Sequence, residues 1–119
     1  MTVFHGTGFY ALEGIKNNGL ELRNRHYVKR KCACTTTDLQ VAQLFAVRRS
    51  TTDEFLNGKI SGIVLEFELE GVLGRHYEPA KDYHTGKEEH EIAVYDPKFL
   101  RLTAIHRWDQ DWIRKEVVA

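Results

Sequence analysis

IVLEFELE, residues 63–70, alternates apolar side chains with mostly acidic ones. A run with a period of two residues is typical of a β-strand that is buried on one face only. On either side of it, related patterns predict further strands at Thr2–His5, Lys31–Thr36, Glu91–Tyr95 and Phe99–Trp108.

Two helices are predicted between these strands. Tyr10–Asn18 fits a short helix with Leu12 and Ile15 buried, and Gly19 stands where a left-handed cap ends a helix. Thr37 or Asp38 can cap a second helix that reaches about Arg49, with an apolar stripe of Leu39, Ala42, Leu44, Phe45 and Ala46.

The remaining segments lack a clear period. We expect a turn at Gly6–Gly8, an irregular basic segment at Leu20–Lys31, a loop or short helical turn at Ser50–Lys59 and scattered turns at Gly71–Lys87; near the C-terminus Trp108 and Trp112 can share a helix face. Strands that bracket two early helices indicate an α+β domain with a mostly antiparallel sheet. The sequence has no glycine-rich nucleotide loop of the kind that would indicate a βαβ fold.

The composition fits one ordinary globular domain, residues 1–119, with 42% hydrophobic and 29% charged residues. Its 17 basic and 17 acidic residues cancel, so net charge indicates neither a nucleic-acid nor a membrane partner. No apolar run is long enough to span a bilayer and the start has no signal pattern, so we expect a cytoplasmic protein, in the producing or the target cell. Cys32 and Cys34 are too close for an ordinary disulfide, which favours reduced thiols.

His5-Gly6-Thr7 is the first candidate site, at the expected end of a strand. The glycine would let a ligand approach the backbone, and the His5 ring offers a nitrogen to a hydroxyl. The alternative is a turn glycine beside a packed histidine.

Thr35-Thr36-Thr37-Asp38 is the second candidate, where a strand leads into a helix that carries Phe45. The hydroxyls of Thr35 and Thr36 could line a cleft, although helix capping alone would also explain them.

Glu89 and Glu91 form the third candidate, two residues apart at the start of a strand. Their side chains should then face the same way, opposite to Ile92 and Val94. Two carboxylates on one face raise the pKa of at least one, which suits acid–base work, while a solvated acidic edge is the plain alternative.

A basic segment around Tyr27 is the fourth candidate. Its cations could hold the phosphates of a dinucleotide or of a nucleic acid, and Tyr27 could stack on a ring; the plain alternative is a solvated loop. The cations are Arg23, Arg25, Lys29, Arg30 and Lys31. The spacing of histidines and cysteines does not favour a metal site.

Taken in chain order, these features resemble the ADP-ribosyltransferase superfamily. They are an HGT after the first strand, a helix that ends in Gly19-Leu20, a hydroxyl-rich strand before the A-x-x-F-A of Ala42–Ala46, and the E-x-x-V-Y-D of Glu91–Asp96. The resemblance covers Phe4 to about Trp108 and is closest to the branch of diphtheria toxin and the poly(ADP-ribose) polymerases. It implies a compact α+β domain with a mostly antiparallel split β-sheet and two or three short helices.

The resemblance also implies roles for single residues. His5 would bind the adenosine-side ribose of NAD, the backbone of Gly6 would pair with the nicotinamide carboxamide, and Glu91 would bond the nicotinamide ribose and stabilise its cationic transition state. The segment from Thr35 to Phe45 would wall the nicotinamide pocket.

The middle motif departs from that branch. The expected stacking tyrosine is replaced by Ala33-Cys34-Thr35, so Tyr27 or Phe45 would supply the ring. Alternatively, the threonines resemble the Ser-Thr-Ser of the arginine-directed branch, whose Glu-x-Glu would make Glu89 the residue that orients the acceptor.

The expected function is therefore mono-ADP-ribosyl transfer from NAD to a macromolecule, in the first place a protein, with release of nicotinamide and no metal. So small a catalytic unit suits a bacterial or phage effector or toxin that inactivates its target. The alternatives are NAD hydrolysis and a nucleic-acid-directed or non-catalytic module on the same fold.

Overall fold

The computed structural model describes residues 1–25, 28–57, 62–80, 91–107 and 114–118. The helical elements are η1 (Phe9–Ala11), α1 (Leu12–Asn18), α2 (Leu39–Asn57) and η2 (Pro97–Phe99). The strands are β1 (Thr2–Gly8), β2 (Arg23–Arg25), β3 (Val28–Thr36), β4 (Gly62–Leu69), β5 (Tyr77–Ala80), β6 (Glu91–Val94), β7 (Leu100–Arg107) and β8 (Arg114–Val117).

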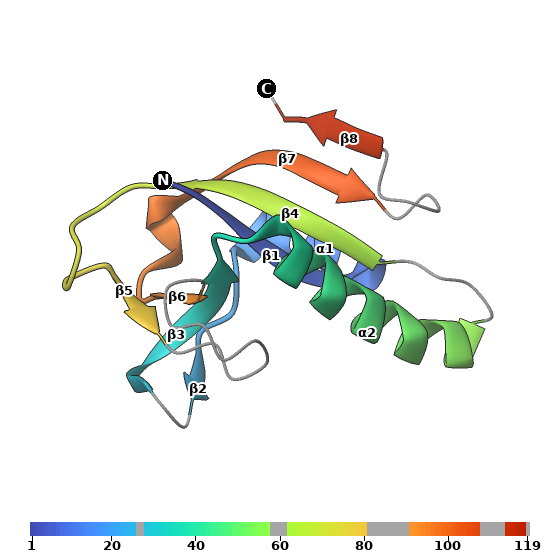
Figure 1. Ribbon diagram of the computed structural model, residues 1–119, viewed down its shortest axis with the longest axis horizontal. Helices are drawn as coiled ribbons and strands as arrows, with labels where there is room; N and C mark the ends of the chain where they lie inside the picture. Colours follow the sequence, from blue (N-terminus) through green and yellow to red (C-terminus); the bar gives the residue numbers. More distant parts are fainter. Residues whose placement is uncertain (26–27, 58–61, 81–90, 108–113, 119) are drawn as a thin grey trace.

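Within the described residues the strands form one sheet in the order β5-β6-β3-β1-β4-β7-β8, with β2 paired to β3 (Figure 1). Each of these strand pairs is antiparallel. The predicted α+β class with a mostly antiparallel sheet is confirmed.

The two faces of the central strands pack on different helices. Val3, Ile63 and Leu65 face a core that includes Leu12 of α1. The intervening Val64 faces α2, where it packs on Ala42 and Ala46. Because α2 covers this side, residues 62–65 of β4 are all buried, and the expected one-sided burial of that strand holds only toward its C-terminal end.

The second helix is longer than predicted. It runs through Asn57, so most of the segment after Arg49, expected to be a loop or a short helical turn, continues the helix. This helix is therefore not one of the short helices expected. Its start agrees with the sequence, because a side-chain oxygen of Asp38 accepts a hydrogen bond from the Gln40 backbone N–H at 2.9 Å. Leu44, expected on the apolar stripe, is 44% exposed.

Several other boundaries need correction. The turn expected at Gly6–Gly8 is wrong, because β1 continues to Gly8 in register with β4. Strands β2 and β5 lie in segments expected to be irregular. Gly19 ends α1 with φ 77°, but its ψ of −178° is not that of a left-handed helical cap.

The last strands of the chain differ less from those expected from the sequence. The strand expected from Phe99 starts one residue later, after η2. Trp108 and Trp112 lie outside the described residues, and the chain beyond them forms the edge strand β8.

Candidate functional site

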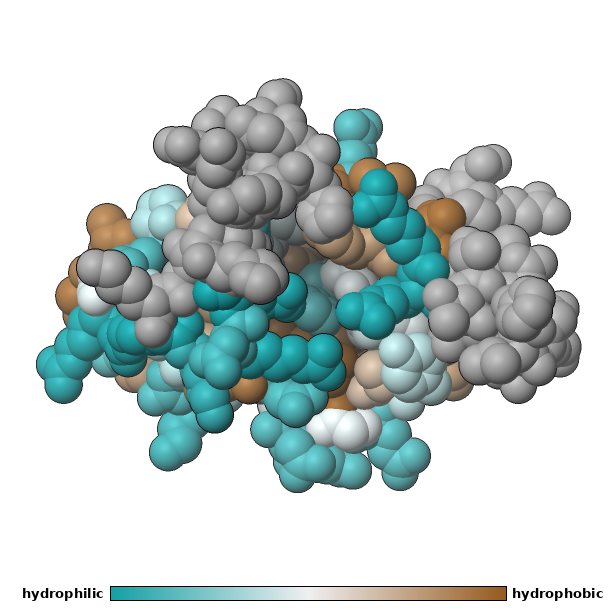
Figure 2. All heavy atoms as spheres, turned by 90° about the horizontal axis from the view of Figure 1, so that it is seen from below, coloured by the Kyte–Doolittle hydropathy of each residue, from teal (hydrophilic) through white to brown (hydrophobic). Residues whose placement is uncertain are grey.

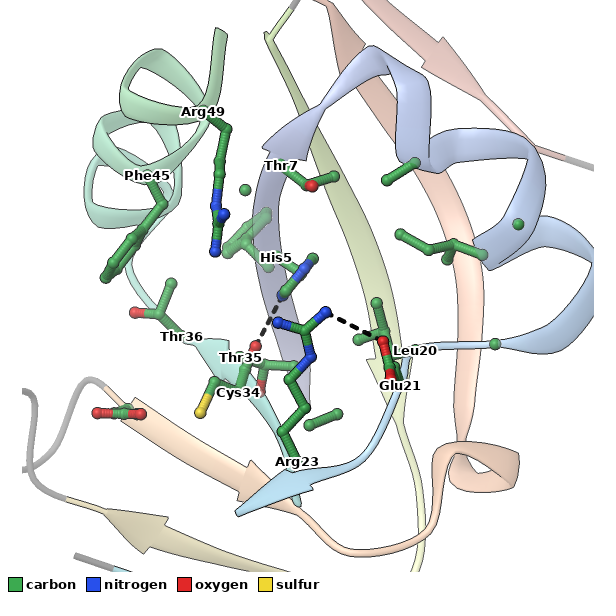
Figure 3. A pocket seen from close by; sticks show the side chains of 18 of the residues that line it. His5, Thr7, Leu20, Glu21, Arg23, Cys34, Thr35, Thr36, Phe45 and Arg49 are labelled. Carbon is green, nitrogen blue, oxygen red and sulfur yellow. Dashed lines mark hydrogen bonds and ion pairs between the residues drawn. The ribbon is translucent and has the colours of Figure 1, made fainter. Parts of the chain in front are cut away.

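A cavity of about 680 Å³ opens beside β1, between α1 and α2 (Figure 3). Among the described residues, β1 pairs with β3 only at Phe4↔Thr36, whereas it pairs with β4 along its whole length. The sheet therefore separates just where the cavity lies. On the face drawn in Figure 2, hydrophilic side chains border a hollow near the middle of the molecule. The predicted residues that line the cavity are His5, Gly6, Thr7, Arg23, Arg25, Thr35, Thr36, Phe45 and Glu91.

The His5 ring lies where β1 and β3 separate, and a hydrogen bond to β3 holds it there. Its Nδ1–H donates to the Cys34 carbonyl oxygen at 2.8 Å, and because a carbonyl can only accept, Nε2 of the neutral ring is left as an acceptor. Burial lowers the pKa of His5, against the raising effect of the Cys34 bond and with the further help of three arginine charges. The ring is thus neutral near pH 7 and can accept a hydrogen bond from a hydroxyl.

Gly6 has a packing reason to be glycine. A Cβ there would stand 1.9 Å from the Ala42 carbonyl oxygen and 2.9 Å from the Ala46 nitrogen. The glycine thus lets α2 lie directly against β1, which brings the helix that carries Phe45 to the edge of the cavity.

The hydroxyls of Thr35 and Thr36 each make a structural hydrogen bond. Thr35 donates to the Ile92 carbonyl at 3.0 Å, which ties β3 to β6. Thr36 accepts from the Asp38 backbone N–H at 3.1 Å, at the turn into α2. Thr35 has used its proton and Thr36 a lone pair, so Thr36 keeps a proton that it can donate.

Glu91 begins β6 and is only 9% exposed. Ile92 and Val94 belong to the main core, so Glu91 points to the opposite face, as predicted. Glu91 also faces Thr36, its partner in the β3–β6 register.

The side chain of Cys34 lies diagonally across from Glu91 on the same face of the β3–β6 pair, close enough for the carboxylate to act on the thiol. Burial, followed by this interaction with Glu91, raises the pKa of Cys34 to about 12, although the charge of Arg25 works in the opposite direction. The thiol therefore stays protonated, which is the reverse of what a thiolate nucleophile needs.

Three arginines surround the mouth of the cavity. Arg23 and Arg25 come from β2 and Arg49 comes from α2. Figure 3 shows Arg23 and Arg49 reaching toward His5 from different walls. Arg23 also donates to Glu21 at 3.0 Å, a contact between exposed side chains. Their charges lower the pKa of His5, which places all three within electrostatic reach of the ring.

Arg49, Tyr10 and Cys34 are among the cavity residues that the sequence did not predict. Arg49 lies four residues after Phe45, and this spacing puts both side chains on one helix face, so Phe45 could have pointed to it. Tyr10 lines the α1 side of the cavity and is 64% exposed. It offers an aromatic face where the sequence proposed Tyr27 or Phe45.

The other predicted residues are not brought to the cavity. Tyr27 and Glu89 lie outside the described residues, as does the side chain of Lys29. Arg30 stacks on the Tyr95 ring, with its guanidinium carbon 4.1 Å from the ring centroid, and donates to the Arg75 carbonyl at 3.3 Å. Lys31 is exposed.

The described residues contain no group of three or more His, Cys, Asp or Glu side chains that could hold a metal ion. No helix within them is long and apolar enough to cross a membrane. Comparisons with protein-family models, with curated proteins and with solved structures return no match.

Proposed function

We propose that this protein is an NAD-dependent mono-ADP-ribosyltransferase that uses Glu91 as its essential carboxylate. The observation that carries the proposal is a single cavity, formed where an antiparallel sheet separates, that collects a buried carboxylate, a neutral histidine and three arginines. Its volume of about 680 Å³ is in the range of small-molecule sites.

The carboxylate suits the chemistry of this reaction. When the bond between nicotinamide and ribose breaks, its electron pair goes to the nicotinamide nitrogen, which becomes neutral, and positive charge develops on the ribose. A fixed, largely buried carboxylate stabilises that charge more strongly than it stabilises the ground state. The acceptor group then attacks the ribose carbon and loses its proton.

The other cavity residues suit the rest of NAD. The Nε2 of His5 is an acceptor for a ribose hydroxyl, as the Nδ1–H bond to Cys34 requires. The guanidinium groups of Arg23, Arg25 and Arg49 provide bidentate donors for the two phosphates. Phe45 and Tyr10 offer ring faces for the bases.

The separation of the sheet supports the same proposal. An ADP-ribosyltransferase fold has a split antiparallel sheet, and β1 and β3 separate after one residue pair. Transfer of ADP-ribose to a protein would fit an effector that inactivates its target.

The test is to incubate the protein with labelled NAD and a cell lysate. We expect release of nicotinamide and transfer of label to a protein. Glu91→Gln should lower nicotinamide release by about 100- to 1,000-fold without lowering the melting temperature, because a charge is lost and the shape is kept. Glu13→Gln, on the exposed face of α1, is the matched control and should behave as the wild type.

The alternatives give different results. Free ADP-ribose without labelled protein would indicate NAD hydrolysis, and Glu89→Gln should reduce transfer more than hydrolysis if Glu89 orients the acceptor. If NAD neither binds nor turns over, and RNA binds with a steep dependence on salt, the arginines serve nucleic acid and the enzyme proposal is wrong.

A further inference from the structure

One residue, Cys34, contacts both residues on which the proposed function depends most. Its backbone carbonyl accepts the Nδ1–H bond of His5 at 2.8 Å, and its side chain is the diagonal neighbour of Glu91 in the β3–β6 register. It lines the same cavity as these two residues. Figure 3 shows the Cys34 side chain directed away from His5, so the thiol and the backbone carbonyl of Cys34 point in different directions.

The strand register explains why the thiol reaches this carboxylate. Thr36 faces Glu91 and Cys34 faces Ala93, so Cys34 and Glu91 are diagonal neighbours on one face of the β3–β6 pair. Diagonal neighbours on an antiparallel pair are within reach of each other when one side chain is long, as that of Glu91 is. The register is fixed further by the Thr35 hydroxyl, which bonds the Ile92 carbonyl on the other face.

We propose that Cys34 is a positioning residue, whose thiol holds the carboxylate of Glu91 in its orientation toward the cavity while its backbone carbonyl fixes the ring of His5. The proposal rests on the proposed function for its kinetic consequences, but the contact itself can be tested without NAD. The two contacts also separate experimentally, because a substitution of the side chain leaves the carbonyl that holds His5 in place.

The first experiment measures the contact by alkylation of Cys34 with iodoacetamide as a function of pH. The chain has only two cysteines, so Cys32→Ala leaves Cys34 as the single thiol. The groups that act on it are Glu91 of β6, Arg25 of β2 and Cys32 of β3 itself. Burial contributes most to the raised pKa of the thiol and remains in the variant, but adding Glu91→Gln removes the contribution of the carboxylate, so the alkylation rate at pH 8.5 should rise by about tenfold for each unit by which the pKa falls.

Glu13→Gln, a substitution of a carboxylate on α1 outside the cavity, is the control for that experiment and should leave the alkylation rate unchanged. An equal alkylation rate in the Cys32→Ala protein with and without the added Glu91→Gln would show that the thiol does not donate to this carboxylate, and would overturn the proposal. This result is independent of whether the protein uses NAD.

The second experiment measures the positioning role by kinetics. We expect Cys34→Ala to lower kcat for nicotinamide release by about tenfold and to change KM for NAD by less than about twofold, because the carboxylate acts mainly in the transition state. Cys34→Ser keeps a donor and should recover kcat to within about threefold of the wild type. Cys32→Ala, which removes the neighbouring thiol, should keep wild-type kcat.

Two results would contradict the positioning role. They are a wild-type kcat in Cys34→Ala, and an equal loss of kcat in Cys34→Ala and Cys34→Ser. If Cys34→Ala does not fold, the comparison of Cys34→Ser with Cys32→Ala and the alkylation rates decide the question. If the wild type does not cleave NAD, the proposed function fails and the alkylation rates alone decide whether Cys34 holds Glu91.

Discussion

Gly6→Ala tests whether the close contact between β1 and α2 builds the cavity wall. The added Cβ would stand 1.9 Å from the Ala42 carbonyl oxygen, whereas real Cβ atoms do not come within 3.0 Å of such atoms, so the strand and the helix must separate by about 1.1 Å. The atoms that collide belong to two backbones, and neither can rotate away as a side chain can.

The expected cost follows from this geometry. Overpacking of a core costs about 1–3 kcal/mol when side chains can adjust, and a clash with helix backbone belongs at the upper end, about 3 kcal/mol. The separation also loosens the packing of Val64 on Ala42 and Ala46. With about 4 °C per kcal/mol for a domain of this size, the melting temperature should fall by about 12 °C.

The assay is thermal unfolding followed by circular dichroism, with Gly14→Ala as the matched control. A Cβ on Gly14 meets nothing within 4 Å, and Gly14 lies in α1, so alanine there should stabilise the protein by about 0.5 kcal/mol through its better helix propensity. A melting temperature for Gly6→Ala within about 2 °C of the wild type, equivalent to roughly 0.5 kcal/mol, would contradict this account of the contact.

Three further substitutions probe charges. The pKa of His5 is lowered in the folded protein, so the unfolded chain binds a proton there first, and the free energy of unfolding should fall as the pH drops below about 6.5. Urea unfolding between pH 7 and 5 should show a smaller fall for His5→Asn than for the wild type. An identical pH dependence in the two proteins would contradict this. Glu66→Gln removes the carboxylate that His106 contacts at 2.9 Å, and should cost about 2 kcal/mol at pH 7 in the same assay, whereas a neutral effect would mean that the pair contributes nothing. Arg49→Ala should weaken NAD binding about tenfold by calorimetry and reduce its salt dependence, while Arg101→Ala on β7 should change neither.

The sequence predicted elements whose signal is local. The alternation in β4 and the cap at Asp38 each depend on neighbouring residues, and both are present in the structure. The burial of Val64 was not predictable in this way, because it depends on where α2 packs. Strand β5 contains Pro79, which a sheet accepts at an edge strand, and β5 is the edge beside β6.

The candidate site divides along the same line. His5 and Glu91 carry recognisable motifs, and both line the cavity. The contribution of Arg49 depends on the close approach of α2 to β1, and that of Cys34 depends on the β3–β6 register. Helical spacing puts Arg49 on the same face as Phe45, but the position of Arg49 or Cys34 at the cavity cannot be predicted from a short stretch of sequence, because each requires two elements to be placed relative to each other.

The gap between β1 and β3 divides the sheet into two sets of strands. Strands β1, β4, β7 and β8 lie on one side of it, and β3, β6, β5 and β2 lie on the other. The pair Phe4↔Thr36 and the hydrogen bond from His5 to the Cys34 carbonyl join the two sets along this seam. A ligand bound there would contact both sets of strands at once and stabilise their arrangement across the seam. At a concentration of 100 times its Kd such a ligand adds about 2.7 kcal/mol to the stability of the fold. Occupied protein should therefore exchange its backbone hydrogens more slowly on both sides of the seam together, including in strands that the ligand never touches.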